Sequence, residues 1–304
     1  MSVLTPSTVA AIDDLELAAR LIVEGARSGA HRSPFHGFTA EFSQHRPYRP
    51  GDDLKYLDWK LLGRTDRLYS RQFRETTSLS VMLVLDASAS MRFPDDPGAV
   101  SKFRYAALVT SALAYLVASQ GDSVGFITMQ DGRFSYLPAR GGRPHLRAVL
   151  ANIARVEPRG AWSLDLALTR GADLLKRRGV LLAVSDFYDA TDATFRDMRR
   201  IARRGHDVAL LQVLSKPEID FPYDASIEFE DLESGERRVI DAGSTARQYR
   251  SGVGSFLTRC RREAHRDGHD YALMRTDTPP ERALRSYLIR RTGAADPTAP
   301  RGVR

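Results

Sequence analysis

The sequence of 304 residues has a single cysteine, few lysines and no long hydrophobic run. One cysteine, Cys260, excludes an intramolecular disulfide and fits a reducing compartment. No apolar stretch approaches the roughly 20 residues that a membrane-spanning helix requires. Residues 1–11 lack the basic start and apolar core of a secretory signal. We therefore expect a cytoplasmic protein with no membrane span.

Positive charge is plentiful, and almost all of it comes from arginine. The chain has 45 basic and 38 acidic residues, a net charge of +7, and lysine occurs only at Lys55, Lys60, Lys102, Lys176 and Lys216. Such a charge permits a basic nucleic-acid-binding scaffold. The arginines are interspersed with acidic residues over most of the chain, which is typical of a solvated, ion-paired surface. We therefore favour no nucleic-acid partner and keep the scaffold as an alternative.

Motifs of the common enzyme classes are also missing. No Gly-x-x-x-x-Gly-Lys-Ser/Thr phosphate loop occurs, so the chain is not itself a P-loop ATPase. The Gly-x-Ser-x-Gly elbow of serine hydrolases is absent, and the seven histidines are scattered. We expect no catalytic residues and a protein that is not an enzyme.

The most informative segment follows the apolar run 79–85, which predicts a buried strand. Asp86, Ser88 and Ser90 come directly after it. Side chains two residues apart on an extended segment point the same way, so these three oxygens should aim at one point. Hard oxygen ligands at the carboxyl end of a strand suit Mg²⁺, or alternatively Mn²⁺ or Ca²⁺. Local capping of the next loop is the competing interpretation.

Strand and helix patterns alternate from residue 79 onward, after a first helical pattern at residues 12–27. This alternation predicts an α/β fold with a doubly wound, mostly parallel sheet and helices on both faces. The expected strands are 79–85, 123–129, 179–185, 206–214 and 269–274, with a strand at 134–137 paired to its predecessor and a hairpin at 226–241. The expected helices are 101–119, 143–154, 164–177, 192–203, 246–266 and 280–291.

A second dense signature lies upstream of the sheet. Its residues are Arg46, Tyr48, Gly51, Asp52, Asp53, Asp58 and Trp59. Pro50-Gly51 indicates a turn, and the two aspartates that follow suit the N-cap of a short helix. The block either builds the fold, as turn, helix cap and core tryptophan, or forms a surface beside the metal loop or for a partner.

Residues 86–91, Asp-Ala-Ser-Ala-Ser-Met, resemble the metal-ion-dependent adhesion site of von Willebrand factor A (vWA) domains. Together with the upstream signature, the chain resembles the bacterial family called domain of unknown function 58 (DUF58). The resemblance implies a vWA-like, Rossmann-like domain at 78–291 that includes a C-terminal helix. We expect it to be preceded by an N-terminal helix at 1–27 and a small β or irregular extension at 28–77, and followed by a disordered tail at 292–304.

The resemblance also implies further ligands and a partner. Asp186, after the strand 179–185, matches the aspartate of the third metal loop of vWA domains. Trp162 stands where the second loop has a threonine, and Ser163 beside it is the candidate substitute. The family resemblance further implies a MoxR-type AAA+ ATPase partner, with which the protein would act in chaperone-like assembly or maturation of other proteins.

We therefore expect a protein-binding module that uses its metal ion to capture a carboxylate of a partner or client protein. A metal-dependent phosphoesterase is the catalytic alternative, because an aspartate after a strand can act as a phosphoryl nucleophile. That chemistry needs a second aspartate two residues on, where this chain has Ser88.

Overall fold

The computed structural model describes residues 5–27, 41–48, 57–65, 67–74, 79–94, 98–130 and 132–292. The chain divides into two compact units. The larger comprises residues 1–34 and 80–304, and the smaller comprises residues 35–79.

A six-stranded sheet forms the centre of the larger unit, with strand order β10-β7-β6-β3-β4-β5. Five strands run parallel, and β5 at one edge pairs antiparallel with β4. The strands are β3 (Ser80–Asp86), β4 (Ser123–Gln130), β5 (Arg133–Arg140), β6 (Gly179–Ser185), β7 (Asp207–Leu214) and β10 (Asp270–Arg275). The mostly parallel α/β sheet predicted from the sequence is confirmed.

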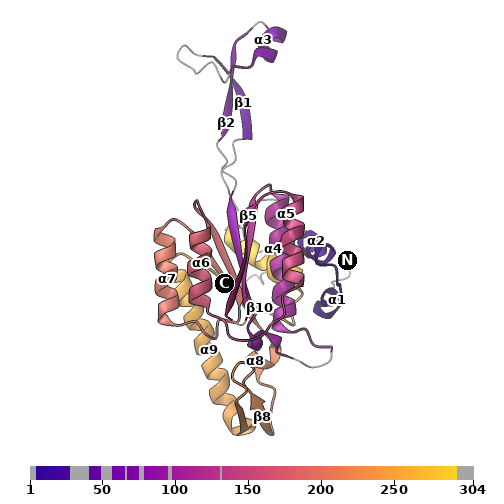
Figure 1. Ribbon diagram of the computed structural model, residues 1–304, viewed down its shortest axis with the longest axis vertical. Coiled ribbons are helices and arrows are strands. Elements are labelled where there is room, and N and C mark those ends of the chain that lie inside the picture. The colour runs from indigo at the N-terminus through magenta and orange to yellow at the C-terminus, as the bar shows by residue number, and fades with distance from the viewer. Residues whose placement is uncertain are drawn as a thin grey trace, which may run out of the picture. The chain divides into compact units, whose positions relative to one another are not determined.

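Helices cover both faces of this sheet (Figure 1). One face carries α4 (Lys102–Ser119), α5 (Arg143–Ala154) and α10 (Pro280–Thr292), with α1 (Pro6–Ala10) and α2 (Leu15–Arg27) packed on them. The other face carries α6 (Leu164–Leu174), α7 (Asp192–Arg203) and α9 (Ala242–Arg266). The described part of residues 1–27, where one N-terminal helix was expected, forms two helices, α1 and α2.

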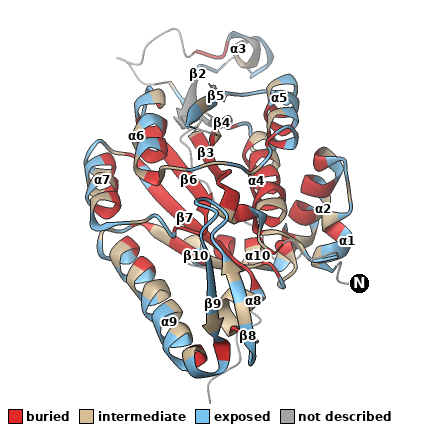
Figure 2. Ribbon diagram, turned by 60° about the horizontal axis from the view of Figure 1, so that its bottom comes forward, coloured by how far each residue is buried: buried red, intermediate tan, exposed pale blue. Residues whose placement is uncertain are grey.

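The central strands are apolar on both faces because helices cover both. Figure 2 shows the buried residues concentrated in these strands and on the helix faces turned toward them. Every residue of β6 is buried, and β3 is buried from Val81 onward. Met82 and Val84 of β3 pack with Leu181 and Ala183 of β6 in the core under α6 and α7. Side chains alternate along a strand, so the intervening residues face the opposite helix layer.

Between β7 and α9 the chain inserts a short helix, α8 (Lys216–Asp220), and a hairpin of β8 (Ser226–Glu230) and β9 (Arg237–Asp241). The hairpin predicted at 226–241 is confirmed. A separate apolar cluster holds its base. The Phe221 ring lies 4.4 Å from the ring of Tyr249 and 5.9 Å from that of Phe229, measured between centroids. The hairpin therefore has a small core of its own.

The smaller unit contains an antiparallel pair, β1 (Glu41–Pro47) and β2 (Tyr69–Arg74), and a helix, α3 (Trp59–Thr65). Asp58 caps α3, because its Oδ1 accepts a hydrogen bond from the Leu61 N–H at 3.0 Å. The sequence prediction placed the cap at Asp52 and Asp53, which lie outside the described residues together with Gly51.

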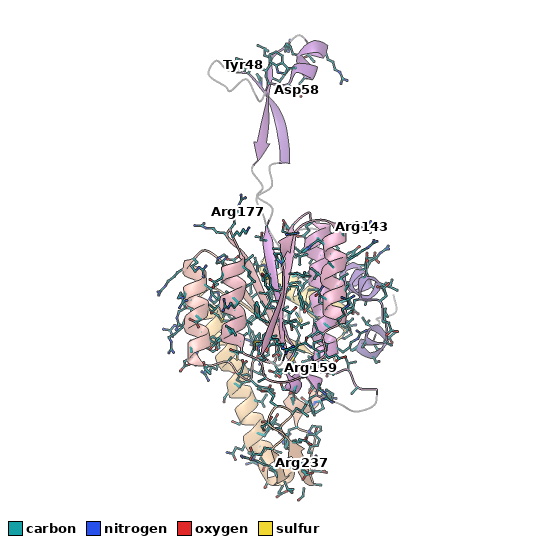
Figure 3. All side chains as sticks on the ribbon, viewed as in Figure 1. Tyr48, Asp58, Arg143, Arg159, Arg177 and Arg237 are labelled. Atoms are coloured by element: carbon teal, nitrogen blue, oxygen red, sulfur yellow. The ribbon has the colours of Figure 1, made fainter. Side chains whose placement is uncertain are left out.

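The described signature residues have unequal environments. Figure 3 shows Tyr48 and Asp58 together near α3. The backbone N–H groups of Tyr48 and Asp58 donate to carbonyls at the start of β2, and Arg46 pairs with Ser70 in the β1–β2 ladder. Asp58 is buried, whereas Trp59 is 64% exposed. Within the smaller unit, Trp59 therefore does not pack as the core tryptophan that was expected.

Candidate functional site

The candidate site lies where the sheet topology creates a crevice. The connection after β3 passes through α4 on one face, and the connection after the neighbouring β6 passes through α7 on the other face. Between two such strands the loops diverge, and ligands of open α/β sheets bind at this point. Asp86 ends β3, and Asp186 directly follows the end of β6. The fold thus brings together residues one hundred positions apart.

Four of the predicted metal ligands converge here. The hydroxyl oxygens of Ser88 and Ser90 lie 3.0 Å apart, and Ser90 Oγ donates to Asp186 Oδ2 at 3.2 Å. These three residues and Asp86 line one cavity. The extended geometry expected for residues 86–90 is wrong, because the chain turns into a 3₁₀ helix, η2 (Ala89–Arg92), after Ser88. That turn brings the two hydroxyl groups together.

Asp86 is almost completely withdrawn from solvent, with 1% of its surface exposed. Its Oδ1 accepts from the Ser88 N–H at 2.8 Å, and its Oδ2 accepts from Ser185 Oγ at 2.6 Å. Burial, and then the negative charge of Asp186, raise the pKa of Asp86 to about 7 despite these hydrogen bonds. A cation close to Asp86 would therefore stabilise its ionised form.

Lys102 is a charged residue of this site that the sequence reasoning missed. Its Nζ contacts Asp186 Oδ2 at 2.7 Å and Glu218 Oε1 at 2.6 Å, with 1% of the side chain exposed. Burial lowers the pKa of Lys102, but the two carboxylates outweigh burial and raise it above its usual value, so the ammonium persists. A lysine on the same helical face as the buried Tyr105 and Val109 is the signal that could have revealed it.

The second loop supplies an aromatic side chain and no hydroxyl. Trp162 lines the cavity, and its buried Nε1 has no hydrogen-bond partner among the described residues. Ser163 caps α6, accepting from the Leu166 N–H at 3.4 Å, and is not among the described residues that line the cavity. Two backbone hydrogen bonds, Arg159 N–H to Ala87 O and Ala89 N–H to Gly160 O, hold this loop against the site.

The cavity has a volume of about 750 Å³ and an acidic lining, in contrast to the basic chain. Aromatic residues of the hairpin cluster form part of its wall. Its basic residues are Lys102 and Arg238, and its acidic residues are Asp86, Asp186, Asp189, Glu218, Glu230, Asp231, Glu233 and Glu236. No group of three or more His, Cys, Asp or Glu side chains in the described part of the chain is arranged to hold a metal ion. A metal site here would need the serine hydroxyls.

The sheet order, with an Asp-x-Ser-x-Ser loop at the end of a central strand, defines a vWA-like α/β protein. More particularly, the chain belongs to the family described as "Protein of unknown function DUF58", whose model matches residues 44–260. The membership inferred from the signature residues is confirmed.

Curated relatives include two bacterial proteins. The uncharacterized protein Rv1480 of Mycobacterium tuberculosis (strain H37Rv) is 30% identical over 234 residues, which are 76% of this chain and 72% of that protein. YeaD of Bacillus subtilis (strain 168), also uncharacterized, is 26% identical over 123 residues, which are 40% of this chain and 28% of that protein.

Solved structures with a similar fold include BatB from Bacteroides thetaiotaomicron, with 15% identity, a TM-score of 0.47, and coverage of 71% of this chain and 100% of that chain. The VWA domain of SpRpn10 has 11% identity and a TM-score of 0.42, covering 70% of this chain and 95% of that chain. At these identities the similarity concerns the fold alone. Within the described residues, no helix has the length and apolar character needed to cross a bilayer.

Proposed function

We propose that this protein is a non-enzymatic protein-interaction module that holds a divalent metal ion at Asp86, Ser88 and Ser90 and captures a carboxylate of a partner through it. Mg²⁺ is the expected ion, with Mn²⁺ or Ca²⁺ as alternatives. The observation that carries this proposal is the convergence of these three side chains and Asp186 on one cavity at the crevice between β3 and β6.

The donor chemistry and the charge of the site support a divalent cation. Carboxylate and hydroxyl oxygens are the hard ligands that Mg²⁺ prefers. The single ammonium of Lys102 contacts two carboxylates, those of Asp186 and Glu218, and so compensates only one of their charges. Asp86, whose pKa is raised by burial, would also be stabilised in its ionised form by a further cation. In the proposal Asp86 and the two serines hold the ion, and Asp186 orients its water ligands. With Trp162 in the second loop, water would take the place of the threonine oxygen.

The acidic lining makes the capture of a carboxylate depend on the ion. A partner carboxylate that entered without metal would meet eight acidic side chains and only two basic ones. Bound metal supplies the positive charge that offsets the desolvation of the incoming group. Following the family resemblance, the proposed partner is a MoxR-type AAA+ ATPase or its client protein, and the proposed role is chaperone-like assembly or maturation of other proteins in the cytoplasm.

Direct binding measurements test this proposal. Wild-type protein should bind Mg²⁺ in calorimetry and should retain a purified MoxR-type ATPase from the same genome on beads, with release by EDTA. Asp86→Ala should lose both properties while keeping the circular dichroism spectrum of the wild type. Asp173→Ala is the matched control, because Asp173 is exposed, pairs with Arg204 and lies outside the cavity lining.

Equal Mg²⁺ binding and equal ATPase retention by Asp86→Ala and wild type would refute the proposal. Turnover of an aryl phosphate that disappears in Asp86→Asn would favour the metal-dependent phosphoesterase.

A further inference from the structure

β10 forms one edge of the central sheet, with β7 as its neighbour on the inner side. At the end of this pairing, the Thr276 N–H donates to Leu214 O. Because the main-chain groups of successive residues in a strand point to alternate sides, Ala272 also faces β7, and Tyr271 and Leu273 face the outer side. Among the residues that the structure describes, the main-chain groups of these two have no strand partner. The outer side of β10 is therefore an open edge.

The two edges of the sheet differ in how well they could accept another strand. β5, at the opposite edge, contains Pro138, and its register with β4 shifts between Val124 and Phe126. A proline and an irregular register are among the features by which edge strands avoid pairing with another chain. β10 has neither, because it contains no proline and pairs with β7 in unbroken register over Asp270–Arg275. The edge at β10 is thus the one suited to pairing with a further strand.

A groove of about 310 Å³ lies along the amino-terminal half of this edge. Tyr271, Ala272 and Leu273 of β10 line it, together with residues from the C-terminal halves of α9 and α10. These two helices contact β10 and lie on either side of it (Figure 2). None of the described residues lines both this groove and the cavity at Asp86. The groove is therefore a separate site, with space beside the strand for an extended segment.

The side chains around the groove are mostly basic. Arg261, His265 and Arg290 line it, and all three are exposed. Arg291 also lines it but is paired with Asp270, the one acidic residue in the described lining. Neither Arg261 nor Arg290 forms an ion pair with another described residue. Two guanidinium groups at the groove are thus free to meet the carboxylates of a ligand, so the groove complements an acidic segment.

We propose that the open edge of β10 binds an extended, acidic segment of a partner protein as an additional strand of the sheet. The main-chain groups of Tyr271 and Leu273 pair with those of the segment, and Arg261 and Arg290 contact its carboxylates. Main-chain pairing holds segments of many sequences, and the basic side chains select the acidic ones. This site needs no metal ion and is independent of the function proposed above.

Binding of designed peptides to the full chain tests this proposal. The probe is a fluorescein-labelled peptide of about six residues, composed of valine, threonine and glutamate. It should bind in fluorescence anisotropy, and replacing its glutamates by lysine should weaken binding at least about tenfold. Two further versions carry N-methyl groups at alternate sets of positions, which removes the N–H donors on one side of the strand only. One version should bind about tenfold more weakly, and the other should bind like the parent peptide.

Hydrogen exchange followed by NMR identifies the edge that the peptide occupies. With the glutamate peptide bound, the amides of Tyr271 and Leu273 should exchange several-fold more slowly. The amide of Ala272 faces β7 and should not change. EDTA and the Asp86→Ala substitution should leave peptide binding as it is in the wild type. Loss of the metal site and loss of this site are therefore distinguishable.

The combined variant Arg261→Ala and Arg290→Ala should bind the glutamate peptide about tenfold more weakly, with an unchanged circular dichroism spectrum. Arg262→Ala is the matched control, because Arg262 also lies on α9, pairs with Glu263 at 3.2 Å and is not among the described residues that line the groove.

Three results would overturn the proposal: no binding of the glutamate peptide, the same affinity for both N-methylated versions, or unchanged binding by the combined variant. If the protein sediments as a dimer, and its dissociation on dilution speeds amide exchange at Tyr271 and Leu273, a second copy of the chain occupies the edge and the proposal is wrong.

Discussion

Replacing Asp86 by asparagine should stabilise the metal-free protein at neutral and alkaline pH. The pKa of Asp86 is about 7 in the folded protein and 3.8 as the ordinary value. The fold therefore prefers the neutral carboxyl group. This preference contributes fully to the free energy of unfolding below about pH 4, and the contribution is lost as the pH rises through 7. Asparagine has a similar shape and does not titrate, so it keeps that stability at every pH.

The size of the effect follows from the difference between the two pKa values. About three pKa units correspond to about 4 kcal/mol in the free energy of unfolding at pH 8. Asparagine retains an oxygen for the Ser88 N–H and directs its NH₂ group at Ser185 Oγ, a hydroxyl that can accept. The advantage of Asp86→Asn over wild type should grow by about 3 kcal/mol between pH 5 and pH 8.

Urea unfolding of both proteins at several pH values, in EDTA, measures this difference. Groups that titrate alike in the two proteins cancel in the comparison. Added Mg²⁺ should then raise the stability of the wild type and leave Asp86→Asn unchanged. A difference between the two proteins that does not vary with pH, or a wild type that is the more stable at pH 8, would refute the reasoning.

Two further substitutions probe the same cavity. Lys102→Met leaves Asp186 and Glu218 without their ammonium partner, so the free energy of unfolding should fall by about 3–5 kcal/mol in urea, with partial recovery in Mg²⁺. A loss below about 1 kcal/mol would contradict this account. Trp162→Thr should raise the affinity for Mn²⁺ several-fold by adding a hydroxyl, and should cost about 3 kcal/mol of stability because Trp162 packs against the main core. Unchanged calorimetric affinity would argue against a second-loop ligand.

The sequence was sufficient for the sheet and for the position of the site. Alternating strand and helix patterns fix a parallel sheet, and the carboxyl ends of its strands must share an edge, so Asp86 and Asp186 were placed together correctly. The path of the chain after Asp86 was not predictable in detail. A strand pattern gives no warning that the backbone turns into a 3₁₀ helix one residue after Ser88.

Contacts between distant segments account for the residues that were missed. The Lys102 ammonium contacts Glu218, which lies 116 positions further along the sequence. Hydrophobic periodicity indicates which face of a helix or strand is buried, but it does not indicate which other element packs against that face. For Trp59, apolar character predicted a core position, whereas the side chain is exposed within the smaller unit.

The cluster of Phe221, Ala242 and Ala246 is separate from the main core. This separation bears on how a partner protein would reach the cavity. Regions with a small independent core open at a lower free energy than the whole protein. We therefore expect the hairpin to open as one unit while the sheet and the loops at its carboxyl end stay intact. If the proposed metal site is correct, the rate at which a partner protein reaches it should depend on the stability of this small aromatic cluster, which lies outside the site.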